Sequence, residues 1–93
     1  MEDKARAHLI VSGRVQGVWF RAETQQAARR IGVHGWVRNN RDGTVEAVVE
    51  GARTAVLAMI DWCRTGPSRS RVEKVEVAWQ PCQGDSADFE IHY

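Results

Sequence analysis

The spacing of hydrophobic and polar residues changes several times along the first half of the chain, and each change marks a predicted element. Residues 6–12 (RAHLIVS) are rich in apolar and β-branched side chains, which is typical of a strand. Beyond Phe20 the apolar positions recur every three or four residues, which predicts an amphipathic helix that ends at Gly32. The residues sharing its apolar face are Phe20, Thr24, Ala27, Ala28 and Ile31.

The rest of the chain is predicted to form one more helix and four more strands. Residues 33–39 (VHGWVRN) and 44–51 (TVEAVVEG) read as two strands joined by a turn over residues 39–43 (NNRDG). A second helix is predicted over residues 52–66, closed by Gly66 and Pro67. A strand over residues 71–79, a polar loop over 80–87 and a short strand over 88–93 follow. The apolar face of the second helix consists of Val56, Met59, Ile60 and Cys63.

This order predicts an α+β fold of the ferredoxin-like type, βαββαβ with a short C-terminal strand. We expect an antiparallel sheet covered on one face by the two helices. In that topology strand 44–51 lies between strands 6–12 and 33–39, which run parallel to each other. Their C-terminal ends should therefore lie on the order of 10 Å apart. The loop after Ser12 and the side chain of Asn39 are predicted to meet at that edge.

Composition limits the classes of function. The chain has 93 residues, 43% of them hydrophobic and 27% charged, so we expect a single globular domain over residues 1–93. The net charge of +1 gives no basic field that would indicate nucleic acid or an anionic membrane as a partner. No apolar run reaches membrane-spanning length and the charged N-terminus is not signal-like, so a cytoplasmic monomer is expected.

Metal and thiol chemistry find little support. No group of His, Cys, Asp or Glu residues has the spacing of metal ligands. We interpret Cys63 as a core residue and Cys82 as a loop thiol. A disulfide between them is an alternative that no motif supports. The three histidines (His8, His34 and His92) are interpreted as isolated structural or surface residues. Three tryptophans (Trp36, Trp62 and Trp79) are interpreted as core or half-buried, with an exposed patch as the alternative for Trp62.

The segment GRVQGVWFR (residues 13–21) carries the strongest chemical signal. Its glycines allow backbone N–H groups to converge on an anion between a strand and a helix, although the segment is neither a Walker motif nor GxGxxG. Arg21 lies in the first helical turn, where the helix dipole disfavours a cation. A bound phosphate would offset both charges. The alternative is a surface arginine that reaches Glu23 or Asp42.

Asn39 and Asn40 are the candidates from the second segment. Asparagine is a common turn residue, which is the simpler interpretation of both. A carboxamide beside the glycine loop could also hold a water molecule, because it donates and accepts hydrogen bonds at once. On these grounds either asparagine could hold the water.

Two long motifs resemble those of the acylphosphatase family. VSGRVQGVWFR (residues 11–21) and GWVRNNRDGTVEAVVEG (residues 35–51) match its first and second motifs, and the likeness extends through the GP after the second helix to the closing FEIHY. The resemblance implies a ferredoxin-like fold and hydrolysis of the carboxyl–phosphate bond of small-molecule acyl phosphates. It implies no metal, cofactor or covalent intermediate. Inorganic phosphate would be the product and an inhibitor.

The resemblance also assigns roles to residues. The phosphate-binding arginine falls on Arg21 and the water-orienting asparagine on Asn39, with Thr24 in a supporting role. Trp19 is a bulky residue at a variable position, where it could affect access or loop mobility. The loop that would hold the phosphate comprises Gln16, Gly17, Val18, Trp19 and Phe20 together with Arg21.

Two other classes of function are compatible with the order of helices and strands. An RNA-recognition module shares the βαββαβ order but needs aromatic rings on the strand that here reads TVEAVVEG, so it is disfavoured. A non-catalytic phosphate- or anion-binding domain on the same fold remains the alternative, which phosphate binding without turnover would identify. Because the predicted site grips only the phosphoryl group, broad acyl specificity is expected.

Overall fold

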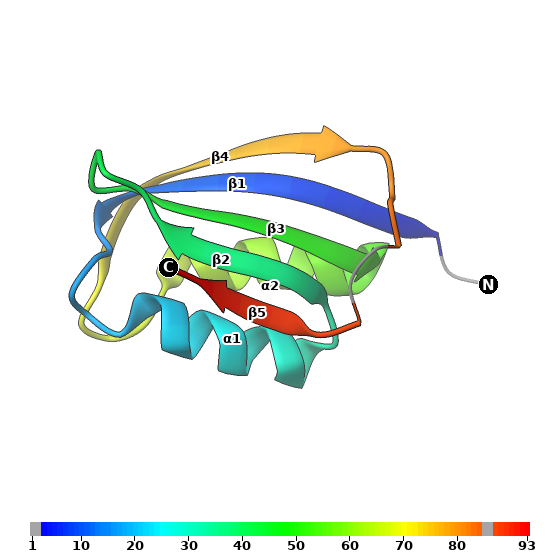
Figure 1. Ribbon diagram of the computed structural model, residues 1–93, viewed down its shortest axis with the longest axis horizontal. Coiled ribbons are helices and arrows are strands. Elements are labelled where there is room, and N and C mark those ends of the chain that lie inside the picture. The colour runs from blue at the N-terminus through cyan, green and yellow to red at the C-terminus, as the bar shows by residue number, and fades with distance from the viewer. Residues whose placement is uncertain (1–2, 85–86) are drawn as a thin grey trace.

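The computed structural model describes residues 3–84 and 87–93 (Figure 1). Its helices and strands follow the predicted order, with boundaries that differ by a few residues. They are β1 (Lys4–Arg14), α1 (Phe20–Ile31), β2 (His34–Asn39), β3 (Val45–Ala52), α2 (Arg53–Thr65), β4 (Arg71–Gln80) and β5 (Phe89–His92). None of the helices in the described ranges is long and apolar enough to cross a membrane.

The strands form one sheet in the order β4-β1-β3-β2-β5. The predicted ferredoxin-like topology is confirmed, with β3 between β1 and β2 and antiparallel to both. The closing strand β5 pairs parallel with β2, so the five-stranded sheet is mixed rather than wholly antiparallel. This pairing carries the residues after β5 to the same end of the sheet as the end of β2 (Figure 1).

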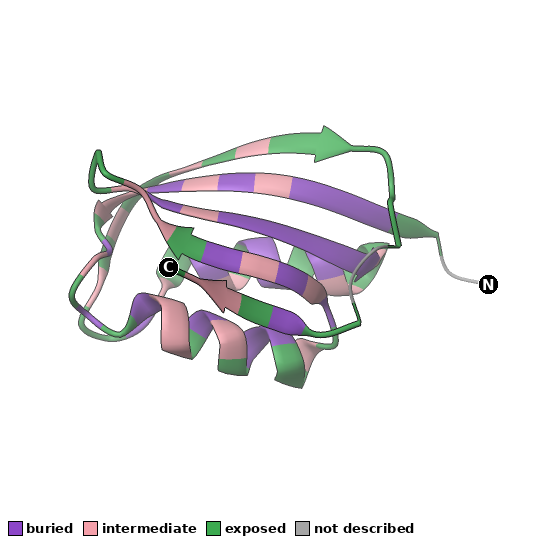
Figure 2. Ribbon diagram, viewed as in Figure 1, coloured by how far each residue is buried: buried purple, intermediate pink, exposed green. Residues whose placement is uncertain are grey.

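Both helices cover the same face of the sheet, and the core lies between them and the central strands (Figure 2). Strand alternation sends Ala7, Leu9 and Val11 of β1 into this layer, where all three are fully buried. The predicted apolar face of α2 is buried throughout. The predicted face of α1 is buried as well, apart from Ile31, which is half-buried at the end of the helix.

Strand β1 extends two residues beyond its predicted end at Ser12. Its pairing with β4 is interrupted between Ser12 and Gly13, where a bulge shifts the register, and then continues to Arg14. Gly13 has φ 123°, and a Cβ there would lie 2.1 Å from the carbonyl oxygen of Arg71. The glycine therefore allows the strand to continue past the bulge, because no side chain fits against β4 at this point.

Of the three tryptophan predictions, the one for Trp79 needs correction. Trp79, expected to be at least half-buried, is 50% exposed because β4 is an edge strand; its ring lies 5.5 Å from the guanidinium carbon of Arg53. Trp62 is half-buried, with its ring 6.0 Å from that of Phe20, so the alternative of an exposed patch is wrong. Within the predicted loop 80–87, residues 85 and 86 lie outside the described residues.

Candidate active site

Three segments that are far apart in sequence meet at one end of the sheet: the β1–α1 loop, the end of β2 and the segment that follows β5 (Figure 1). They enclose an open cavity of about 370 Å³. A cavity of this size fits a small-molecule ligand. Its walls are Val15, Gly17, Trp19, Phe20, Arg21, Ala22, Asn39, Ile91 and Tyr93.

The loop enters α1 through two residues with left-handed backbone. Gly17 has φ 73°, and Trp19, the residue before the helix, has φ 63° and ψ 20°. Trp19 makes no side-chain cap to the helix, and the first turn of a helix has N–H groups without intrahelical partners. Such a turn, preceded by a glycine-containing loop, has the backbone chemistry of an anion site.

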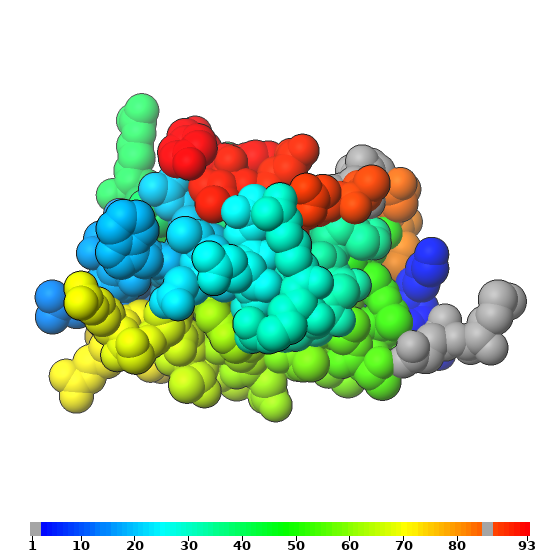
Figure 3. Space-filling view, turned by 90° about the horizontal axis from the view of Figure 1, so that it is seen from below, coloured from blue at the N-terminus to red at the C-terminus, as the bar shows by residue number. Residues whose placement is uncertain are grey.

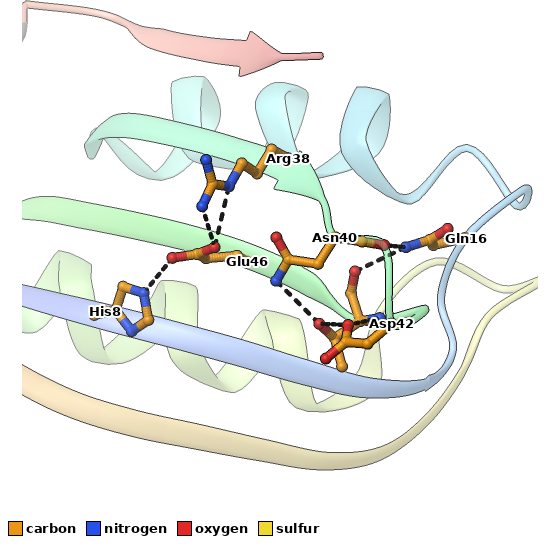
Figure 4. Close-up of polar contacts among 7 residues, drawn as sticks. His8, Gln16, Arg38, Asn40, Asp42 and Glu46 are labelled. Carbon is orange, nitrogen blue, oxygen red and sulfur yellow. Dashed lines mark hydrogen bonds and ion pairs between the residues drawn. The ribbon is translucent and has the colours of Figure 1, made fainter.

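The side chain of Gln16 ties this loop to the β2–β3 turn (Figure 4). Its amide nitrogen donates to the carbonyl oxygens of Asn40 at 2.7 Å and Thr44 at 2.9 Å. Sequence reasoning listed Gln16 for its backbone alone and missed this contact, since nothing local to residue 16 points to a turn 24 residues away. The contact fixes the loop beside the end of β2.

Arg21 lines the cavity, and its contacts among the described residues are not acidic. Its Nη1 donates to the carbonyl oxygen of His92 at 3.3 Å, and its guanidinium carbon lies 4.9 Å from the ring centroid of Tyr93. No carboxylate of the described residues forms an ion pair with it, so the expected alternative of a bridge to Glu23 or Asp42 does not hold.

Asp42 is engaged within its own turn instead. Its carboxylate accepts hydrogen bonds from the hydroxyl of Thr44 at 2.6 Å and from the backbone N–H of the same residue at 3.0 Å. These donors, the hydroxyl first, lower the pKa of the Asp42 carboxyl. The turn is thereby stabilised independently of Arg21.

The two asparagines occupy different environments. The Oδ1 atom of Asn39 is buried and accepts no hydrogen bond from the described residues, while the side chain lines the cavity. The Nδ2 atom of Asn40 donates to the hydroxyl of Thr44 at 3.0 Å, which makes it a turn residue (Figure 4). The tertiary structure therefore separates two residues that physical reasoning from sequence left unranked.

Comparison with known proteins identifies the family of the chain. A sequence model of the acylphosphatase family matches residues 7–91. The acylphosphatase of Roseiflexus sp. (strain RS-1) is 56% identical over 91 residues, 98% of each chain. The acylphosphatase of Anaeromyxobacter dehalogenans (strain 2CP-C) is 54% identical over the whole of both chains. The crystal structure of the Bacillus subtilis acylphosphatase superposes with a TM-score of 0.92 at 34% identity, covering 96% of this chain and 99% of that one.

The chain belongs to the acylphosphatase family. The resemblance drawn from the two motifs is confirmed, as are the fold and the hydrolase class. A small-molecule acyl phosphate substrate and a phosphate-binding function follow from the family.

Thr24 lies outside the cavity of this acylphosphatase. It is buried, and its hydroxyl donates to the carbonyl oxygen of Phe20 one turn earlier at 2.6 Å. It therefore contacts the residue at which the loop becomes helix. Val18 and Phe20 are buried as well, so of the predicted loop side chains it is Trp19 that stays exposed.

Two lining residues that lie far along the chain from the glycine loop were missed by sequence reasoning. Ile91 and Tyr93 were predicted as alternating members of a last strand, with no link to the glycine loop. The parallel pairing of β5 with β2 brings them to the cavity. A β-rich hexapeptide indicates a strand but not its neighbour, so no local signal could have placed them.

Other reactive groups lie away from the site. Cys63 is a buried thiol whose pKa burial raises to about 12, and Cys82 is an exposed thiol; the two are not joined. His8 is not isolated, because its Nε2 lies 2.6 Å from the carboxylate of Glu46, which also accepts from Arg38 (Figure 4). Within residues 3–84 and 87–93 no three His, Cys, Asp or Glu side chains could share a metal ion.

Proposed function

We propose that this chain hydrolyses acyl phosphates at the cavity between the β1–α1 loop and the end of β2. Arg21 and the loop amides of residues 16–20 would hold the phosphoryl group, and Asn39 would orient the attacking water. One observation carries the proposal: two residues line the same cavity, Arg21, which has no acidic partner among the described residues, and Asn39, whose buried Oδ1 has no hydrogen-bond partner there.

The phosphoryl group is the natural counter-ion of this site. Arg21 is always charged, and its planar guanidinium matches two phosphate oxygens. Its contact with the His92 carbonyl uses one of five N–H donors, so the others are available to a ligand. The N-terminus of α1 adds the field of the helix dipole, and an anion there would offset both positive contributions.

The chemistry needs charge stabilisation and positioning. A water oxygen forms a bond to phosphorus while the bond from phosphorus to the carboxylate oxygen breaks and its electron pair leaves on the carboxylate. The substrate dianion and water give the carboxylate anion and dihydrogen phosphate, so the proton of the water ends on the phosphate. Because the carboxylate leaves readily, the loop and Arg21 would stabilise the charge that develops on the phosphoryl oxygens.

Asn39 suits a water-orienting role. Its carboxamide would hydrogen-bond the water, so that a lone pair of the water oxygen points toward phosphorus. The carboxamide is no base at neutral pH, so its contribution would be orientation. Thr24 would support the site by fixing the carbonyl of Phe20 where the loop becomes helix.

The deciding experiment is the initial rate of benzoyl phosphate hydrolysis in excess EDTA. Arg21→Ala and Asn39→Ala should each lower kcat/KM by at least about 100-fold, the scale of losing one transition-state hydrogen-bond donor. Two matched controls are Arg41→Ala, an exposed arginine of the neighbouring turn, and Asn40→Ala. Arg41→Ala should keep wild-type activity, and Asn40→Ala should lose stability more than turnover. Equal losses in Asn39→Ala and Asn40→Ala would contradict the assignment.

Phosphate binding gives an independent readout. Millimolar inorganic phosphate should raise the melting temperature of the wild type, because a ligand of the native state stabilises it. Arg21→Ala should lose this shift. If the wild type shows the shift but no turnover, the chain is a phosphate-binding domain on the same fold. The cytoplasmic location and the absence of a cofactor stay predictions. The monomeric state and the independence from metals stay predictions as well, and gel filtration and the EDTA arm test these two.

A further inference from the structure

Trp19 combines an unfavourable backbone conformation with an exposed aromatic side chain. Among the described non-glycine residues it alone has positive φ, at 63°. A left-handed conformation costs an L-residue on the order of 1–2 kcal/mol. Its indole is nevertheless 73% exposed, so burial in the core does not offset this cost. A strained, exposed aromatic residue at the rim of a site is best explained by contact with a ligand.

A second exposed ring faces the same cavity. Tyr93 is 99% exposed, and one face of its ring lies over the guanidinium of Arg21. The half-buried side chain of Ile91 lines the cavity beside it. The site where the phosphoryl group is expected to bind is thus bordered by the exposed rings of Trp19 and Tyr93 and by the half-buried side chain of Ile91.

The two sides of Trp19 differ in chemistry. In the space-filling view the β1–α1 loop lies between the C-terminal segment, in red, and the segment after α2, in yellow (Figure 3). On the first side it shares the cavity with Ile91 and Tyr93. On the second it borders a more open hollow whose polar residues are Glu23, Gln26, Ser68 and Arg69. An apolar acyl group is therefore best received on the Tyr93 side.

We propose that Trp19 and Tyr93 are specificity-determining residues that bind the acyl group of the substrate and favour acyl phosphates with a flat, aromatic acyl group. This inference rests on the proposed function and narrows the broad specificity expected from the sequence. Both rings would lose exposed apolar surface when the substrate binds. An aromatic pair stabilises by about 0.5–1.5 kcal/mol beyond the area that it buries. A small aliphatic acyl group would gain little from either ring.

The test compares kcat/KM for benzoyl phosphate with kcat/KM for acetyl phosphate in the same protein. Trp19→Ala keeps a Cβ and hence the backbone strain, so it removes the ring alone. The benzoyl-to-acetyl ratio should fall about tenfold in this variant and severalfold in Tyr93→Ala. Trp19→Phe should keep most of the wild-type ratio. Trp79→Ala, which removes an exposed tryptophan from the edge strand β4, should leave the ratio unchanged.

The outcomes separate the two proposals. A wild type that hydrolyses both substrates, with the same ratio in Trp19→Ala and Tyr93→Ala, overturns the acyl-binding role while the proposed function stands. A wild type that hydrolyses neither overturns both. The inhibition constant of inorganic phosphate, measured in each variant, reports whether the loop still holds its anion. If Trp19→Ala loses the loop, Tyr93→Ala decides the question, because Tyr93 lies outside it.

Discussion

The side-chain amide of Gln16 donates a 2.7 Å hydrogen bond to the backbone carbonyl oxygen of Asn40, directly after Asn39 in the chain. This bond, with a second to the carbonyl oxygen of Thr44, joins the β1–α1 loop to the turn that follows β2 (Figure 4). One glutamine side chain therefore links the segment of the proposed anion site to the turn beside the proposed water site.

Gln16→Ala should lower the free energy of unfolding by about 1–2 kcal/mol, because two carbonyl oxygens lose their donor. It should also lower kcat/KM, since loop and turn would no longer be held together. Urea denaturation and the benzoyl phosphate assay measure the two effects. Gln26→Ala, an exposed glutamine of α1, serves as the stability control and should change unfolding by less than about 0.5 kcal/mol. Identical stability of Gln16→Ala and Gln26→Ala would show that the contact between Gln16 and the β2–β3 turn does not stabilise the fold.

Two glycines with positive φ should respond differently to alanine. Gly13→Ala would place a methyl group 2.1 Å from the Arg71 carbonyl oxygen, whereas Gly17, at φ 73°, has open space around it. We expect a loss of about 3 kcal/mol or more for Gly13→Ala and about 1 kcal/mol for Gly17→Ala, which reflects backbone strain alone. Thermal and urea unfolding of the two variants check the order. A larger loss for Gly17→Ala would show that the bulge is not constrained as described.

Glu50 should make stability depend on acid pH. Burial raises the pKa of its carboxyl, but hydrogen bonds from the backbone N–H of Gln83, from Arg6 and from the N–H of Gly84 outweigh burial, so the pKa lies below its usual value. A carboxyl whose pKa is lower in the folded than in the unfolded state stabilises the fold. That stabilisation is fully present when the pH is above the pKa of the unfolded state, about 4.3. That contribution is lost as the pH falls through the folded pKa.

Glu50→Gln should therefore flatten the fall in unfolding free energy between about pH 5 and pH 3. At pH 7 it should cost about 3 kcal/mol, because the buried Arg6 guanidinium loses its 3.0 Å ion pair with this carboxylate. Urea denaturation across this pH range gives both values. Glu73→Gln, at an exposed position of β4, should keep the wild-type slope. A wild-type slope in Glu50→Gln would assign the acid sensitivity elsewhere.

The two thiols should react at very different rates. Burial raises the pKa of the Cys63 thiol to about 12 and shields its sulfur, whereas Cys82 is exposed. Ellman's reagent at pH 8 should label one thiol of the native protein rapidly and the second after denaturation. Cys82→Ser should abolish the rapid phase, and a rapid phase that persists in this variant would contradict the burial of Cys63.

The sequence alone settled what depends on neighbours along the chain. The period of apolar residues indicated each helix and strand, and the order of elements indicated the sheet, because burial of one face per element imposes those periods. The two motifs supplied the family. Arg21 stood out locally, since its position in the first helical turn conflicts with the helix dipole.

The tertiary structure decided what depends on partners distant in sequence. It directed Asn39 into the cavity while Asn40 stayed in the turn, and it tied Gln16 across 24 residues. It also brought Tyr93 beside Arg21 through the parallel pairing of β5, and it left Trp79 exposed on an edge strand. Hydrogen-bond partners and strand neighbours depend on how the whole chain packs. The local pattern of a segment therefore does not indicate which distant group it will contact.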